Sequence, residues 1–508
     1  MINALQPFGA PDCESDLAIL GEDRYSKYYF HFTHFNRESL DPSVYLIVGR
    51  RGSGKTALTR FFSFQKVIQN SIEVDIDEPI AFHEVMSKIV EVGSFNRELQ
   101  IPRLVKIWEY VIWSAIFHEL KSKDARIRAA CTLDGEEGVS KIIRLLLQSL
   151  LNKYLGTEDD LLDELDRVFR SATFKQAKEA VLEFAHKHPL IVAVDTLEKY
   201  SVNDEKLMIT IAALVEFAAM FCREYAQKNI HVKVFMMDEI FPYLIEDYIS
   251  NTLKYVKDEI YLHWKPKDLM RMICWRLFQY LRLKDLSKLK TADIDWNNHR
   301  DVKEKIWKSY FGEWIENGGN IKEKTFPYVL RHTQLRPRQL IVLCNSIAKQ
   351  SLRSKNFPNF SPRDMFFGIQ SAGVSLADEV FNAYSSAYPN AARIADALSG
   401  IPPIFRAKEL DRRAPQTASQ WLDDYSPYRF RQFVAELGIV GRVRHRNEAT
   451  GIVEADFEYF KRGRLIISTD DLCVIHPMFY TKLNVSFSEK LCIYPFPDHE
   501  EFVGLNYG

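Results

Sequence analysis

The stretch that decides the fold reads VYLIVGRRGSGKTALTRFF and spans residues 44–62. Residues 44–48 form a short apolar run rich in β-branched side chains, which is typical of a buried strand in a parallel sheet. Residues 49–56 satisfy the pattern G-x-x-x-x-G-K-[ST] completely, and apolar residues then recur at helical spacing. Strand, glycine-rich turn and helix in this order predict a phosphate-binding loop (P-loop) rather than a chance glycine turn.

Each residue type in this loop has a physical reason. Glycines let backbone N–H groups curl around phosphate oxygens without Cβ clashes, and the following helix points its positive end at them. Lys55 can reach the β- and γ-phosphates, and Thr56 can offer its hydroxyl to Mg²⁺. We therefore expect ATP and Mg²⁺ as cofactors, with the loop itself open to ATP or GTP. The predicted nucleotide contacts in the loop are Gly49, Gly52, Ser53, Gly54, Lys55, Thr56 and Ala57.

A P-loop also needs a carboxylate at the tip of a neighbouring strand to hold the metal. Asp195 follows the apolar run at 190–194, and ligands of open α/β sheets bind at such carboxyl ends of strands. Glu198 comes shortly afterwards and can orient the attacking water. The predicted catalytic residues are therefore Lys55, Asp195 and Glu198, with Thr56 and Asp195 as metal ligands.

A second predicted strand also ends in acidic residues and competes for the metal role. Residues 231–241 read HVKVFMMDEIF and contain the acidic pair Asp238–Glu239. The run at 190–194 is more apolar and comes first, and the next parallel strand in such folds normally carries the sensor of the γ-phosphate. We therefore assign the metal to Asp195 and place Asp238 at the sensor position, with its role left open.

Bulk composition limits the class of protein. A length of 508 residues suits roughly three domains, and 46% hydrophobic with 27% charged residues is ordinary for a soluble globular chain. The formal charge of −1 gives no global attraction to nucleic acid, so any such surface must be local. The 7 cysteines have no CxxC or metal-like spacing, which indicates reduced thiols. Without a signal peptide or an apolar run of about 20 residues, we expect a cytoplasmic protein with no membrane partner.

The predicted fold class is α/β. It combines a P-loop NTPase with a parallel sheet and a large helical insertion, a helical lid and a C-terminal winged-helix domain. The expected parts are an N-terminal segment at 1–40, the ATPase core at 41–265 with its insertion at about 75–187, the lid at 266–372 and the winged-helix domain at 373–508. Helical periodicity at 103–120 and 141–155 supports the insertion, and Trp108 and Trp113 are expected in its core.

The predicted lid contains the segment LRPRQLIVLCNSIAKQ at 335–350. Arg336 and Arg338 flank Pro337, and proline is favoured at the first position of a helix. An arginine at this helix start can lean over the phosphates of a nucleotide, which makes Arg338 a candidate nucleotide contact. A solvated basic helix start is the alternative.

The predicted winged helix begins with SPYRFRQFVAELG at 426–438, where Ser426 serves as N-cap and Gly438 ends the helix. Three short strands follow, at 439–446, 453–460 and 472–477. The basic cluster RVRHR at 442–446 falls on the predicted wing. Arginines on a wing can grip DNA phosphates, but the domain can also pack against its own nucleotide site.

Together these motifs resemble a known kind of protein. FGAPDCESD at 8–16, VGRRGSGKT, DTLE at 195–198, LRPR and VIHPMFY at 474–480 resemble a bacterial P-loop ATPase family. That family is similar to the signal-transduction ATPases (STAND) and to the origin-recognition branch of AAA+ ATPases. The resemblance covers nearly the whole chain, and only its P-loop is specific by itself.

The resemblance implies roles for single residues. DTLE is similar to the DxLD element of signalling ATPases, which makes Asp195 the metal carboxylate and Glu198 the water-orienting acid. Lys199 stands where such proteins often carry an acid, which argues for slow hydrolysis. Relatives tend to carry a sensor arginine where Met236 and Met237 stand here, so Arg338 or a neighbouring subunit would have to supply that cation.

His476 in VIHP is similar to the winged-helix histidine that holds ADP in the closed state of signalling ATPases. A histidine of the ordinary core is the alternative. The resemblance thus adds His476 to the expected nucleotide contacts, which already include Arg338.

Two functions are compatible with these residues. The first is a nucleotide switch: ATP binding and slow hydrolysis change how the protein assembles with itself or with a separate effector protein, as in bacterial antiviral defence. The sequence has no HExxH, GxSxG or Cys/His metal cluster, so an effector enzyme would be another polypeptide. The second is a DNA-binding ATPase like an origin-recognition or transposition regulator; RVRHR favours it, and the neutral overall charge disfavours it.

Overall fold

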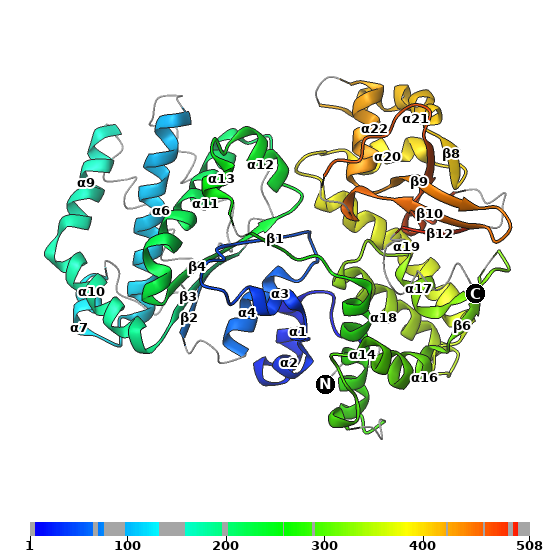
Figure 1. The fold of residues 1–508 in the computed structure, drawn as a ribbon, viewed down its shortest axis with the longest axis horizontal. Coiled ribbons are helices and arrows are strands. Elements are labelled where there is room, and N and C mark those ends of the chain that lie inside the picture. The colour runs from blue at the N-terminus through cyan, green and yellow to red at the C-terminus, as the bar shows by residue number, and fades with distance from the viewer. Residues whose placement is uncertain are drawn as a thin grey trace. The chain divides into compact units, whose positions relative to one another are not determined.

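The computed structural model divides the chain into two compact units. One unit, Thr33–Leu262, is called the P-loop unit here. The other joins Met1–Phe32 to His263–Gly508 and is called the two-segment unit. Figure 1 shows the helices and strands along the chain. The structure describes residues 6–64, 70–75, 97–131, 158–195, 202–257, 259–286, 290–317, 319–422, 425–460, 463–485 and 491–495.

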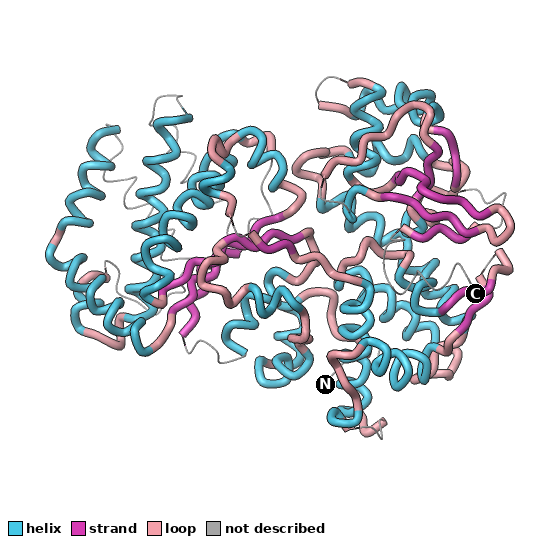
Figure 2. Tube along the Cα trace, in the orientation of Figure 1, coloured by secondary structure: helices cyan, strands magenta, loops and turns pink. Residues whose placement is uncertain are grey.

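The P-loop unit is built on a five-stranded sheet with the strand order β2-β3-β4-β1-β5, and every described pairing in it is parallel. The strands are β1 (Leu46–Gly49), β2 (Asn70–Asp75), β3 (Leu190–Asp195), β4 (Ile230–Met237) and β5 (Ile260–Tyr261). Figure 2 shows them as one group of magenta strands. Because the strands are parallel, their carboxyl ends share one edge of the sheet. The strands predicted from residues 44–48, 190–194 and 231–237 are thereby confirmed.

Different helices cover the two faces of this sheet. On one face, Leu46, Val48, Val192 and Val194 belong to a large apolar core that includes residues of α6 (Arg97–Leu120) and α11 (Glu205–Tyr225). On the opposite face, α4 (Lys55–Phe64) packs against β2 and β3. Neighbouring residues of a strand point to opposite faces, so the strand alternation decides which side chains can meet α4.

The connection between β2 and β3 carries helices, as the sequence predicts. The described ones are α6, α7 (Ala125–Ala129), α9 (Glu158–Arg170) and α10 (Ala172–Lys187). Trp108 and Trp113 are 1% and 0% exposed and belong to the apolar core, which confirms their expected place. The Trp108 indole donates a hydrogen bond to the carbonyl oxygen of Thr210 on α11 at 3.1 Å. The helix expected at 141–155 lies outside the described residues. The unit also contains α3 (His34–Glu38), α12 (Phe241–Asp247) and α13 (Thr252–Tyr255).

The first half of the two-segment unit is helical. It comprises α1 (Cys13–Leu20), α2 (Glu22–Tyr28), α14 (Pro266–Leu283), α15 (His299–Val302), α16 (Lys308–Phe311), α17 (Thr325–Leu330), α18 (Pro337–Arg353) and α19 (Pro362–Ala383), with a small hairpin of β6 (Trp314–Glu316) and β7 (Lys322–Lys324). Among the described residues, no helix is both long enough and apolar enough to cross a membrane.

The N-terminal residues are fastened to these helices. Arg276 of α14 forms a buried ion pair with Asp16 at 2.8 Å and donates to the carbonyl oxygen of Phe8 at 3.0 Å. Asn345 of α18 donates to the carbonyl oxygen of Gly9 at 2.8 Å. The sequence treated 1–40 as one segment, whereas the structure groups Met1–Phe32 with the chain after residue 262 and leaves 33–40 in the P-loop unit. Long-range polar contacts of FGAPDCESD, invisible to local patterns, account for the difference.

The C-terminal part combines short helices with a second sheet of order β12-β10-β9-β11-β8. Its elements are α20 (Ala391–Ala395), β8 (Ile404–Arg406), α21 (Lys408–Arg413), α22 (Pro427–Glu436), β9 (Val440–Asn447), β10 (Ile452–Asp456), β11 (Leu472–Ile475) and β12 (Cys492–Tyr494). Ser426 caps α22 by accepting from the Arg429 N–H, as predicted, and the three expected strands are present. The interpretation of this part as a winged helix stays a prediction.

Candidate functional site

The turn between β1 and α4 has the backbone that a phosphate cradle needs. Gly52 and Gly54 have φ angles of 80° and 98°, which L-residues with a Cβ rarely adopt. A Cβ on Gly49 would lie 2.5 Å from the Ser53 Oγ atom, so the turn also excludes a side chain at its first position. The geometry therefore favours glycine at both glycine positions of the sequence pattern, Gly49 and Gly54, and also at Gly52.

Lys55 lies across this turn instead of extending into solvent. Its side chain is buried, and its Nζ atom donates to the carbonyl oxygens of Gly49 at 2.9 Å and Arg50 at 3.3 Å. The Ser53 N–H closes the turn onto the Arg50 carbonyl at 3.0 Å, and the Leu58 N–H donates to the Gly54 carbonyl at 2.9 Å as α4 begins. The Lys55 ammonium group thus lies at the N-terminus of α4, where an anion is favoured.

The end of β4 holds the start of the loop. The Asp238 N–H donates to the carbonyl oxygen of Gly49 at 3.2 Å, and both carboxylate oxygens of Glu239 accept from the Arg51 N–H, at 3.0 and 3.2 Å. Glu239 is 3% exposed, so this anchor is shielded from water. The sequence offered Asp238–Glu239 only as a rival metal site. Nothing local in it signals that Glu239 binds a backbone N–H 188 residues away.

Asp195 is the last residue of β3 and is 2% exposed. Val192 and Val194 face the core on the α11 side, so strand alternation turns Asp195 toward the face that α4 covers. Thr56 lies in the first turn of that helix, directly after Lys55. The topology thus puts both predicted metal ligands on the same face of the sheet. Glu198 and Lys199 lie outside the described residues.

β4 lies between β1 and β3 in the sheet. Val234 pairs with Leu46 of β1 on one side and with Val194 of β3 on the other. The strand after the one that ends in Asp195 is therefore the direct neighbour of the P-loop strand. This is where a strand that senses the state of the loop would have to lie, and Met236 and Met237 are its last residues.

Arg338 belongs to the two-segment unit, at the start of α18. Its Nε atom donates to the carbonyl oxygen of Pro11 at 3.1 Å, and its Nη1 atom lies 3.8 Å from a Glu379 carboxylate oxygen. Within its unit, the guanidinium thus helps to fasten the N-terminal segment. A contact between Arg338 and a nucleotide stays a prediction.

His476 is 0% exposed in the two-segment unit. Its Nδ1 atom accepts from the Met478 N–H at 3.1 Å, and its Nε2 atom lies 2.7 Å from the Tyr459 hydroxyl oxygen. Because Nδ1 accepts, a neutral ring carries its proton on Nε2 and donates it to Tyr459. Both nitrogens thus serve internal contacts, as the core alternative predicts, and the contact with ADP stays a prediction.

The basic cluster of β9 is partly neutralised. Arg444 pairs with Asp456 of β10 at 2.7 Å, and Arg442 lies 4.0 Å from the same carboxylate. Their side chains are 37% and 40% exposed. The hairpin therefore presents partly exposed arginines to solvent, and the Asp456 carboxylate offsets part of their charge.

The P-loop residues fit a magnesium-bound nucleoside triphosphate. Backbone N–H groups between Gly49 and Thr56 and the N-terminus of α4 suit the phosphates, and Lys55 suits their charge. The Thr56 hydroxyl and the Asp195 carboxylate are hard oxygen donors of the kind that Mg²⁺ takes together with phosphate oxygens. The parallel sheet, the P-loop and the helices around them fit an α/β P-loop NTPase.

Comparison with known proteins gives a distant likeness only. No protein-family model matches the sequence, and no curated protein does. Among solved structures, the ORC2 protein of Aeropyrum pernix with ADPNP and ADP matches with a TM-score of 0.34 and 11% identity, covering 90% of this chain and 89% of that one. The ADP form of the same protein matches with a TM-score of 0.26 and 11% identity, over 87% of each chain. A likeness this weak does not assign a function.

Proposed function

We propose that this protein is an ATP-binding, slowly hydrolysing switch ATPase that controls assembly with copies of itself or with an effector protein. The observation that carries the proposal is the turn at 49–56. Two of its glycines have positive φ angles, and its lysine donates hydrogen bonds to two carbonyl oxygens of the loop. Such a turn directly before a helix is a ready-made site for a triphosphate.

In this proposal each residue has one task. The loop N–H groups and Lys55 bind and orient the phosphates, with Gly49, Gly52, Ser53, Gly54 and Ala57 shaping the cradle. Thr56 and Asp195 would hold Mg²⁺, which when bound neutralises phosphate charge. Glu198 would orient the attacking water. The buried position of Asp195 on the face of the sheet that α4, with Thr56, covers supports its assignment to the metal.

The switch itself would start at the anchor between β4 and the loop. A ligand shifts a conformational equilibrium only by its difference in affinity between two states. Because Glu239 binds the Arg51 N–H, a movement of the loop on phosphate binding would also move the end of β4. This contact supports the proposal that the nucleotide bound in the loop changes a surface that binds a partner protein. The sequence resemblance points to a partner in an antiviral defence system.

Nucleotide binding is tested by the variant Lys55→Ala. Loss of a charge-assisted contact costs about 2–3 kcal/mol, so the affinity for ATP should fall about 100-fold in isothermal titration calorimetry with Mg²⁺. Lys187→Ala, an exposed lysine at the end of α10, is the matched control and should bind ATP normally. Unchanged affinity of a folded Lys55→Ala protein would refute the site. Sizing by mass photometry with ADP or a slowly hydrolysed ATP analogue tests the switch, because a constant monomer contradicts nucleotide-controlled self-assembly and leaves only assembly with an effector.

A DNA-binding ATPase is the second candidate, favoured by the arginines that β9 presents on its hairpin with β10. If they grip duplex DNA, affinity should fall steeply with salt and disappear in a triple alanine variant of Arg442, Arg444 and Arg446. Binding that is weak, or that survives in this variant, would reject the candidate.

A further inference from the structure

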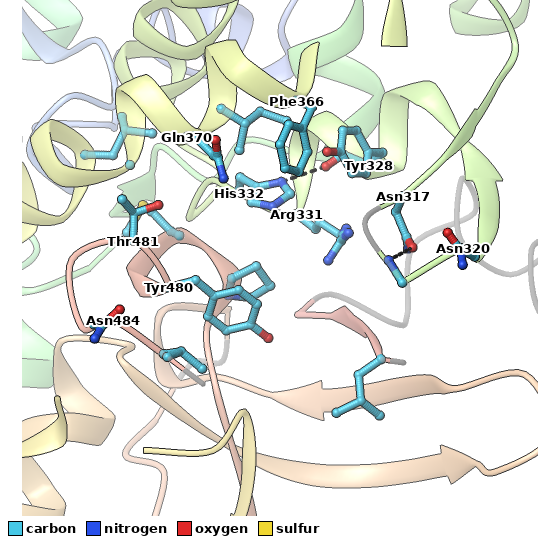
Figure 3. A pocket seen from close by; sticks show the side chains of 18 residues that line it. Asn317, Asn320, Tyr328, Arg331, His332, Phe366, Gln370, Tyr480, Thr481 and Asn484 are labelled. Carbon is cyan, nitrogen blue, oxygen red and sulfur yellow. Dashed lines mark hydrogen bonds between the residues drawn. The ribbon is translucent and has the colours of Figure 1, made fainter. Parts of the chain in front are cut away.

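The two-segment unit contains a cavity of about 720 Å³ that has no role in the proposed ATPase site. α17, α19 and the segments around β6 and residues 477–485 line it. Its volume lies within the range of pockets that bind small organic molecules. Figure 3 shows polar and aromatic side chains from these elements pointing into one space.

One wall of the cavity carries a buried arginine that is only partly satisfied. Arg331 is 6% exposed, and its Nη2 atom donates to Glu323 at 3.1 Å. Its Nε atom is buried and has no hydrogen-bond acceptor among the residues that the structure describes. Figure 3 shows the side chain between Asn317 and Tyr480, within the cavity. A buried donor without an acceptor costs free energy, so a ligand gains affinity if the Arg331 guanidinium turns toward the cavity and its N–H groups meet an acceptor there.

The partner of Arg331 is already saturated with donors. Besides Arg331, Glu323 accepts from Asn317 at 2.7 Å, from Cys492 at 3.3 Å and from Tyr494 at 3.0 Å. The ion pair is close to neutral as a whole. Arg331 is the one Arg or Lys among the described residues that line the cavity, and none of those residues is Asp or Glu. Such a site lacks the net charge to hold a multiply charged anion and favours an uncharged ligand with hydrogen-bond acceptors.

His332 adds an acceptor to the same wall. Burial, together with the nearby charge of Arg331, holds the pKa of His332 well below its ordinary value, so the ring is neutral at physiological pH. Its Nδ1 atom lies 2.8 Å from the carbonyl oxygen of Tyr328 and therefore carries the proton. The other ring nitrogen is left as an acceptor. Arg331 and His332 together offer a donor fork and an acceptor side by side.

The remaining lining suits a flat ring. Phe366 of α19 lines the cavity and is 38% exposed, so part of its ring is open to a ligand. Ile369, Leu376 and Met478 extend the apolar surface, and the side-chain amide of Gln370 lies at the same wall. Aromatic side chains stack on planar heterocycles with a gain of about 1–3 kcal/mol per base.

We propose that this cavity binds the base of a purine nucleoside. Arg331 would donate hydrogen bonds to an edge of the base that carries two neighbouring acceptors, and Phe366 would stack on its ring. The O6 and N7 atoms of guanine form such an edge, and arginine binds them as a two-pronged donor. Guanosine is therefore the preferred ligand, adenosine a weaker one, and uridine the poorest. The site is independent of the P-loop, because it needs no phosphate.

The experiment is equilibrium dialysis of the full-length chain carrying Lys55→Ala, with guanosine, adenosine, uridine and benzoate as probes. We expect guanosine to bind at least about 10-fold more tightly than uridine. Benzoate is included because a carboxylate also fits an arginine fork. Binding of benzoate with no binding of guanosine, or no saturable purine binding by folded protein, overturns the proposal. Either result leaves ATP binding at the P-loop of the unmutated chain untouched.

Neighbouring phenylalanines provide a matched pair of variants. Phe366 and Phe367 are 38% and 43% exposed on α19, but only Phe366 is among the described residues that line the cavity. Phe366→Ala should weaken guanosine binding at least about 10-fold. Phe367→Ala should have a clearly smaller effect, because the Phe367 ring packs edge-to-face on Phe366, with centroids 5.5 Å apart, and is not among the described residues that line the cavity. Equal effects of the two variants would overturn the proposal. Arg331→Lys, checked for folding by circular dichroism, should abolish the preference for guanosine over adenosine, because lysine lacks the fork.

Discussion

The neighbouring strands β3 and β4 both end in acidic residues at the carboxyl edge of one sheet, but the two ends are placed differently. Asp195 of β3 is buried on the face of the sheet that is covered by α4, the helix that follows the P-loop. At the end of β4, Glu239 instead accepts from the Arg51 N–H, and the backbone of Asp238 joins Gly49. The same local pattern, an apolar strand followed by a carboxylate, thus provides a candidate metal ligand in one strand and a scaffold for the loop in the other.

The strongest test of this difference exchanges single atoms at the two ends. Asp195→Asn should lower Mg²⁺-dependent phosphate release about 100-fold, because a metal ligand is worth several kcal/mol in the transition state, while ATP affinity is largely kept. Asp238→Asn should stay within about 3-fold of the unmutated rate, because the variant keeps the backbone N–H that Asp238 donates to the Gly49 carbonyl oxygen. The reverse result would give the metal to Asp238.

Acid should reveal a second difference, in the body of β4. His231 of β4 is paired with Ile191 of β3, and burial, assisted by the charge of Lys233, lowers its pKa to about 4. The unfolded chain, with a histidine pKa near 6.5, binds the proton more readily, so stability is lost as pH falls below about 6.5. From pH 7.5 to 5 the contribution of His231 to this loss should be about 2 kcal/mol in urea unfolding followed by circular dichroism.

The control for this titration is His231→Gln, which keeps a polar group but cannot titrate. Its stability should change less than that of the unmutated chain over the same pH interval. An identical pH dependence in the two proteins would show that other groups dominate the acid response.

The smallest effect concerns the anchor itself. Glu239→Gln keeps the size of the side chain but loses the charge that strengthens its hydrogen bond to the Arg51 N–H. We expect about 10-fold weaker ATP binding, because the loop loses part of its preorganisation. Glu246→Gln, on the exposed side of α12, is the matched control and should have no effect. Normal ATP affinity of Glu239→Gln would reduce the anchor to a packing contact.

The parts that sequence reasoning predicted are those set by local patterns. The run at 44–62 predicts β1, the turn and α4 because each is determined by neighbours within a few residues, and the same holds for β3 and for the Ser426 cap of α22. Periodicity also placed Trp108 in the core of a helical insertion.

What sequence reasoning missed depends on contacts between distant residues. The anchor of Arg51 by Glu239, the ion pair of Asp16 with Arg276 and the saturation of Glu323 each join residues that no window of sequence contains together. Such pairs follow from the three-dimensional arrangement of whole elements, so local patterning leaves them undetermined. The cavity around Arg331 was missed for the same reason.

The ion pair of Asp16 with Arg276 also has a consequence for synthesis on the ribosome. Residues 33–262 are translated between these two partners, which takes roughly 10–50 s at ordinary elongation rates. The continuous P-loop unit can therefore fold first, while Phe8, Tyr25 and Tyr28, all nearly inaccessible in the finished protein, await the helices that bury them. During this interval these aromatic side chains stay exposed to solvent, and a ribosomal pause before codon 276 would prolong their exposure.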